Sequence, residues 1–208
     1  MTINDPEHRP EIVGFIVVRK PGLASTPDLS NVHELDGKLY HGVDRLPWED
    51  LDAAYYDGNL RAELLSIRET LREESLDLSG FVILRDLAQA RKVRDSWSSV
   101  SDIIAIWSRD LVQLKGVVRA EIDLDYLGLD CVGGLEFSNE WSVLSDGLYR
   151  APEHFGSLRQ RINAYGLLDS EDDCRAVFSR YVALSAQDIV EPLAESATPM
   201  IVKVFAVR

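Results

Sequence analysis

The sequence Met200-Ile-Val-Lys-Val-Phe-Ala-Val207 is an almost unbroken run of apolar, largely β-branched residues that directly follows Pro199. Such a run predicts a buried strand, and its hydrophobic character on both sides is typical of a strand in the centre of a sheet. A second run of this kind, Glu11-Ile-Val-Gly-Phe-Ile-Val-Val-Arg19, predicts another buried strand. We therefore expect two buried strands, one at residues 11–19 and one at residues 200–207.

The sequence between these runs predicts both strands and helices. Further strands are expected at residues 81–84 and 103–107, and an extended stretch over residues 117–132 is interrupted near Gly128. Helical spacing of apolar residues predicts amphipathic helices at about 60–75, 86–97 and 155–165, and a further helix is expected at about 170–183. These elements indicate an α+β fold, in which a mixed, mainly antiparallel sheet is packed by amphipathic helices. We expect residues 1–208 to form a single domain, and a division into two subdomains near residue 100 is the alternative.

The charge balance of the chain limits its partners. The 208 residues include 35 acidic and 22 basic side chains, which gives a net charge of −13. Such a chain is repelled by phosphate backbones and anionic membranes, so we expect no nucleic-acid and no membrane partner. The first residues lack the features of a signal peptide, and no apolar run is long enough to span a bilayer. Together with only two cysteines, which we interpret as reduced thiols, this pattern favours a cytoplasmic protein.

The most unusual local feature is an acidic stretch between Ala120 and Tyr149, which contains seven acids and no Lys or Arg. Glu121, Asp123 and Asp125 alternate with apolar residues, so on a strand their carboxylates would share one face, about 7 Å apart. One interpretation is a solvated sheet face or an edge protected by charge. Another is a docking strip for a basic partner, because a cation would relieve the repulsion among the acids.

A metal site is the third interpretation of the acidic stretch. Asp123 and Asp125 form a D-x-D pattern with Asp130 nearby, and hard cations such as Mg²⁺ take carboxylate ligands. A metal-dependent hydrolase or transferase with His33, His41 or His154 as its base is therefore the alternative function. The chain lacks a nucleophile elbow, a P-loop and a dinucleotide-binding fingerprint. We consequently expect no catalytic residue, no cofactor and no resident metal.

Aromatic residues accompany the acids, since Trp141 lies in the same stretch, and aromatic anchors with an acidic rim are typical of protein-binding hot spots. In charge and size the chain resembles bacterial toxin-immunity proteins, which neutralise a toxin by covering its active site. The resemblance implies a non-catalytic inhibitor of a basic protein partner, for example a toxin domain. The predicted partner-binding residues are Glu121, Asp123, Asp125, Asp130, Glu136, Glu140 and Trp141.

A second acidic cluster has a structural interpretation. In Asp169-Ser-Glu-Asp-Asp173, Ser170 or Asp169 can cap a helix whose first turn then contains three acids. Acids in the first turn interact favourably with the helix dipole. The cluster is therefore explained without a ligand.

Overall fold

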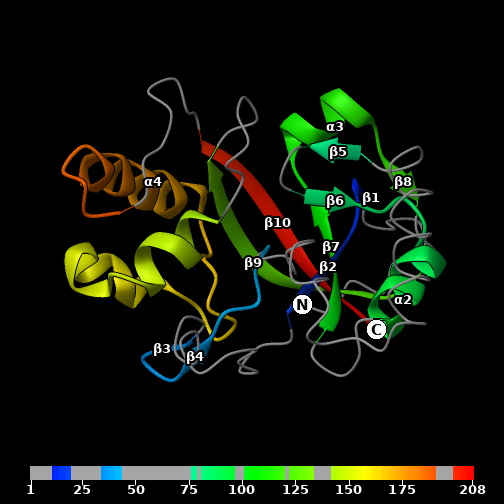
Figure 1. Cartoon of the computed structure of the whole chain (residues 1–208), viewed down its shortest axis with the longest axis horizontal. Helices are drawn as coiled ribbons and strands as arrows, with labels where there is room; N and C mark the ends of the chain where they lie inside the picture. The colour runs from blue at the N-terminus through cyan, green and yellow to red at the C-terminus, as the bar shows by residue number, and fades with distance from the viewer. Residues whose placement is uncertain are drawn as a thin grey trace, which may run out of the picture.

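The computed structural model describes residues 11–19, 34–43, 76–78, 81–96, 101–119, 122–133, 142–190 and 199–208. Its main sheet has four strands, all paired antiparallel, in the order β2-β7-β10-β9 (Figure 1). These strands are β2 (Gly14–Arg19), β7 (Ser101–Trp107), β9 (Leu124–Gly133) and β10 (Pro199–Val207). The predicted C-terminal strand is thus confirmed and has neighbours on both sides, whereas β9 and β2 are the outer strands.

The register of β9 against β10 changes once. Tyr126 is opposite Phe205, but Gly128 is opposite Val204, so β9 contains one extra residue between them. Gly128 has a φ of +150°, and a Cβ atom there would lie 2.7 Å from the side-chain nitrogen of Asn163. The interruption expected near Gly128 is therefore a β-bulge at a position where only glycine fits.

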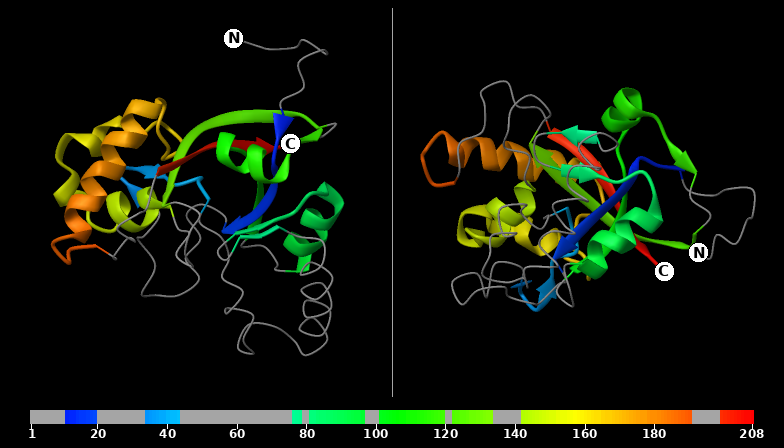
Figure 2. Two further views of the ribbon diagram at one scale, coloured as in Figure 1. Left: turned by 90° about the horizontal axis from the view of Figure 1, so that it is seen from above. Right: turned by 45° about the vertical axis from the view of Figure 1, so that its right-hand side comes forward.

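Two hydrophobic clusters cover the sheet. The smaller one joins β2 and β7 to helix α2 (Leu87–Ser96) through residues such as Phe15, Ala90 and Ile103. The larger one surrounds helix α4 (Glu171–Ser185), which packs against β9 and β10. Both views in Figure 2 place α4 and α2 at opposite ends of the molecule.

Shorter elements complete the described part of the fold. Three two-stranded sheets pair β1 with β8, β3 with β4, and β5 with β6. A helix, α3, follows β7 directly, a π-helix η4 precedes a 3-10 helix η5, and η4 and η5 both contact α4. The bounds are β1 (Glu11–Ile12), β3 (Glu34–Leu35), β4 (Lys38–Leu39), β5 (Leu76–Leu78), β6 (Phe81–Ile83), β8 (Val118–Arg119), α3 (Arg109–Lys115), η4 (Leu144–Tyr149) and η5 (Pro152–Arg161).

The architecture is α+β, as the sequence predicts. The helices expected at 86–97 and 170–183 are α2 and α4. The helix expected at 155–165 is instead the 3-10 helix η5, which contains a kink at Gly156 and ends four residues before Tyr165. The helix expected at 60–75 lies outside the described residues. Within the described ranges, no helix combines the length and the apolar composition that a membrane span requires.

Candidate binding surface at the edge of the sheet

The first half of β9 brings two of the predicted binding residues to the edge of the sheet. Asp123 immediately precedes the strand and is exposed, and the side chain of Asp125 is 46% exposed. Opposite residues of paired strands share a face, so Asp125 shares its face with Ala206. These two acids are therefore available at the surface of the described structure.

The backbone N–H and C=O groups of the same segment point alternately toward β10 and away from the sheet. The amide of Arg208 donates to the carbonyl oxygen of Asp123, at 3.3 Å, so Asp123 directs its backbone groups toward β10. Because the orientation alternates along a strand, Asp125 does the same, and Leu124 and Tyr126 direct theirs away from the sheet. Within the ranges described above, no residue bonds to these outward N–H and C=O groups.

Farther along β9, the outward backbone groups do have partners. The side-chain amide of Asn163 donates to the carbonyl oxygen of Leu127, at 2.9 Å. Leu129 and Leu168 exchange both of their backbone hydrogen bonds, at 2.7 and 2.9 Å. The loop that follows η5 thus covers the edge from the bulge onward and stops short of Tyr126.

Tyr126 is the most exposed large hydrophobic residue of the described structure, at 50% exposure. Its ring meets Phe205 edge to face, with 5.6 Å between the ring centroids. Partial burial raises the pKa of the Tyr126 hydroxyl, and the negative charge of Asp169 adds to this effect. Asp169 is itself exposed and accepts a hydrogen bond from Asn163, so it contributes a third carboxylate to the same edge. We call Asp123, Asp125, Tyr126 and Asp169 the edge patch.

Among the residues that the structure describes, one basic side chain contacts the edge patch. The guanidinium of Arg208 donates to the carboxylate of Asp125, and the Arg208 side chain is 68% exposed. An ion pair this exposed contributes little to stability and exchanges readily with other cations. Tyr126, Asp169 and Arg208 could not be identified as part of a site from the sequence, because only the strand pairing and the bulge bring them together.

Asp130 is not part of this surface, contrary to the sequence prediction. Its side chain is completely buried on the same face of the sheet as Val202. The carboxylate accepts hydrogen bonds from the Tyr40 hydroxyl at 2.5 Å, the Ser142 hydroxyl at 2.6 Å, and the backbone amides of Val43 and Cys131 at 2.9 and 2.7 Å. A partner protein cannot reach Asp130 in this fold.

The surroundings of Asp130 explain why a buried carboxyl is tolerated. Burial raises its pKa, although all four hydrogen bonds act in the opposite direction. Cys131 and Cys174 are free thiols, as predicted. Both are buried, and burial raises the pKa of Cys174 to about 12. Both cysteines are therefore protonated, unreactive thiols. The Asp130 network joins the chain after β4 and the chain before η4 to the central part of β9.

The described residues do not assemble the metal site that the alternative function requires. In the described part of the chain, no three His, Cys, Asp or Glu side chains are close enough together to hold a metal ion. Asp125 pairs with Arg208, Asp130 is enclosed by hydrogen-bond donors, and His154 lies beside Glu153. The Nδ1 atom of His41 faces two backbone carbonyl oxygens. His33 lies outside the described residues.

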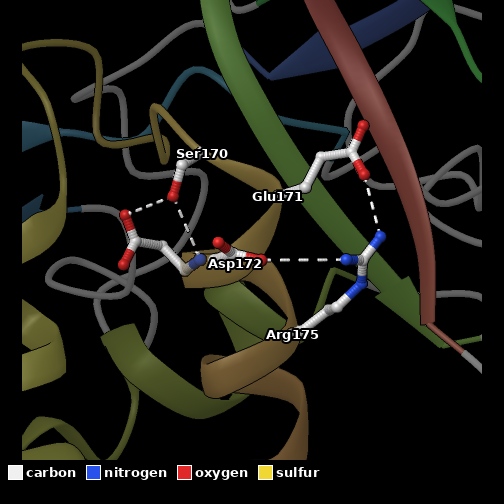
Figure 3. A network of polar contacts seen from close by, with 5 residues as sticks. Ser170, Glu171, Asp172 and Arg175 are labelled. Atoms are coloured by element: carbon white, nitrogen blue, oxygen red, sulfur yellow. Dashed lines mark hydrogen bonds and ion pairs between the residues drawn. The ribbon is translucent and has the colours of Figure 1, made fainter.

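The second acidic cluster has the structural role that the sequence predicts. Ser170 is the N-cap of α4, and its hydroxyl accepts a hydrogen bond from the backbone amide of Asp173 at 3.1 Å. Figure 3 shows Arg175 reaching back to Glu171 and Asp172 in the first turn. These contacts account for the cluster as a helix start.

The remaining predicted binding residues, Glu121, Glu136, Glu140 and Trp141, lie outside the described residues. A comparison of the chain with protein-family models, curated proteins and solved structures finds no match in any of the three.

Proposed function

We propose that the chain is a non-catalytic acidic binding protein that masks a basic protein partner, in the manner of bacterial toxin-immunity proteins. The observation that carries this proposal is the edge patch. In a chain of net charge −13, the exposed Asp123 and the half-exposed Asp125 lie on one face of this sheet edge, and the half-exposed ring of Tyr126 lies on the other face of the same edge. An aromatic side chain with charged neighbours is the typical composition of an interface hot spot.

Electrostatic attraction favours a basic protein as the partner that binds at the edge patch. The charge of the whole chain attracts cations from a distance, and the edge patch then provides carboxylates at fixed positions on a strand. Asp123 and Asp125 repel each other in the free protein, so a cationic partner lowers the electrostatic energy of the edge. Association of this kind is fast and weakens with salt, because the Debye length shrinks to about 8 Å at physiological ionic strength.

The proposal is tested by capture from a lysate of the source cells at low and at high salt. The baits are the wild-type protein, the double variant Asp123→Asn/Asp125→Asn, and a matched control, Asp110→Asn/Asp188→Asn. Each double variant removes two acidic side chains and changes the net charge by the same amount. Asp110 lies in α3 and Asp188 follows α4, so the control leaves the edge patch intact.

We expect one dominant basic protein to bind the wild type and the control, to be released by salt, and to be lost with the edge variant. The identity of that protein would then define the activity that is masked. Equal capture by both double variants would remove the edge patch from the proposed function. Failure of any basic protein to bind would contradict the proposal as a whole.

A further inference from the structure

The edges of the main sheet differ in how they are covered. On the β2 side, Phe15 exchanges two backbone hydrogen bonds with Leu84, both 2.8 Å long. On the β9 side, bridges to Leu168 and Ser142 cover the second half of the strand. At Leu124 and Tyr126, in contrast, the described residues leave the outward backbone groups without partners.

We propose that this part of β9 binds an extended basic segment of the partner protein as an additional antiparallel strand of the sheet. The inference rests on the proposed function and specifies how the partner is bound. Unpaired N–H and C=O groups at a sheet edge are a template for a further strand, and strand addition is a common mode of peptide recognition. The uncovered segment from Asp123 to Tyr126 offers room for about four residues, or roughly 13 Å.

The side chains of this segment specify the chemistry of the incoming strand. Asp123 and Asp125 lie on one face, while Leu124 and Tyr126 lie on the other. An added strand places its own alternate side chains opposite these two faces. The complementary segment therefore alternates basic and apolar residues, with the bases opposite the carboxylates and the apolar residues beside the tyrosine.

A second copy of this chain fits the edge less well. Pairing two β9 edges would bring Asp123 and Asp125 of one copy close to the same acids of the other. Like charges at such distances oppose pairing, and charged residues on edge strands are a common protection against self-association. The same acids that exclude a second copy attract a basic strand, so one feature explains both properties.

The backbone orientation allows a precise test with synthetic peptides. The probe is the capped peptide Lys-Val-Lys-Val-Lys-Val-Lys, and its affinity for the full chain is measured by titration at low salt. In an antiparallel pair, the residues opposite Leu124 and Tyr126 are the valines, and their N–H groups point toward β9. Two control peptides have equal charge and almost equal shape: one carries N-methyl groups on valine and the other on two of the lysines.

We expect N-methylation of valine to reduce the affinity about tenfold or more, because donors to the β9 edge are lost, and N-methylation of lysine to have little effect. Binding of the unmodified peptide should also slow hydrogen exchange at the outward amides of Leu124 and Tyr126, measured by NMR. Equal affinity of all three peptides, or binding without this protection, would overturn strand addition.

The outcomes separate the two proposals. If all three peptides bind equally and the Asp123→Asn/Asp125→Asn variant binds none of them, strand addition is wrong while the acidic binding surface remains supported. If the unmodified peptide does not bind the wild type at all, strand addition is wrong, and the capture of a basic protein from the lysate then decides the proposed function by itself. If sedimentation shows a dimer that Tyr126→Pro dissociates and Tyr126→Thr does not, the occupant is a second copy and the basic strand is excluded.

Discussion

Replacing Asp130 by asparagine changes one buried atom from an acceptor to a donor, and the consequence follows from the hydrogen bonds at this site. The two hydroxyl donors, Tyr40 and Ser142, can rotate, but the backbone amides of Val43 and Cys131 cannot. Each carboxylate oxygen accepts from one hydroxyl and one amide. Either orientation of the new side chain therefore leaves at least one buried N–H group without an acceptor, because the Ser142 hydroxyl already accepts from the amides of Leu144 and Ser145.

An unpaired group of this kind costs about 1–3 kcal/mol in the free energy of unfolding. For a chain of this length, each kcal/mol lowers Tm by about 2–4 °C. The assay is urea unfolding at constant pH, followed by circular dichroism, with an unchanged m-value as the sign of an unchanged unfolding reaction. The matched control is Asp123→Asn, which makes the same substitution at an exposed site and should change stability by less than about 0.5 kcal/mol.

The effect of pH on the Asp130→Asn variant has a definite sign. Burial raises the pKa of Asp130 in the folded protein above its value in the unfolded chain. The folded state therefore holds this proton more tightly, so the contribution is fully present below about pH 4 and is lost as pH rises through the folded-state pKa. Asparagine does not titrate, so the stability difference between wild type and variant should shrink as pH rises.

The two aspartates should separate stability from binding. Asp130→Asn should lower the free energy of unfolding and leave the affinity for the Lys-Val peptide unchanged. Asp123→Asn should lower the affinity for this peptide and leave the free energy of unfolding almost unchanged. If Asp130→Asn is as stable as Asp123→Asn, then Asp130 does not hold the chain after β4 and the chain before η4 onto the sheet. If Asp130→Asn instead weakens peptide binding while unfolding normally, its exclusion from the binding surface is wrong.

Three further outcomes are expected. Arg208→Ala frees the Asp125 carboxylate, so titration should show an affinity for the Lys-Val peptide about two- to fivefold higher. An unchanged or lower affinity would show that Arg208 does not compete with the peptide lysines for Asp125. Ser170→Ala removes the N-cap of α4 and should cost about 1 kcal/mol in urea unfolding, while Ser170→Gly should recover part of that loss. The hydrogen bond from Arg161 lowers the pKa of Asp173, so its contribution to stability is present above about pH 3.9 and is lost as pH falls through the folded-state pKa. The difference in unfolding free energy between wild type and Asp173→Asn should therefore be smaller at strongly acidic pH than at pH 6, and a pH-independent difference would show that the ion pair does not form.

The strands and helices with strong local patterns could be predicted from the sequence. The apolar run at 200–207 is long enough to specify a central strand, and it forms β10 between β7 and β9. The start of α4 is specified by Ser170 and the acids that follow it, since an N-cap and its first turn depend only on neighbouring residues. In each case, the information that decides the structure lies within a few residues.

Features that depend on distant residues were not predictable in the same way. Helix α3 is only seven residues long, so its apolar pattern is too short to distinguish it from a loop. Tyr149 and Gly166 are joined by a hydrogen bond of 3.0 Å across the turn after η5, and a Cβ atom at Gly166 would lie 2.1 Å from that hydroxyl. The sequence shows the glycine but does not identify the side chain that requires it.

The different fates of Asp125 and Asp130 follow from the bulge between them. In a regular strand, residues five positions apart face opposite sides, but the extra residue before Gly128 puts both carboxylates on one face of β9. Their exposure then depends on what covers that face: Tyr40, Val43 and Ser142 enclose Asp130, whereas Asp125 remains half exposed. The bulge also coincides with the point where the loop after η5 begins to cover the edge, through Asn163. One glycine thus divides β9 into a part that the core encloses and a part whose edge the described residues leave uncovered, and the proposed docking surface lies on the uncovered part.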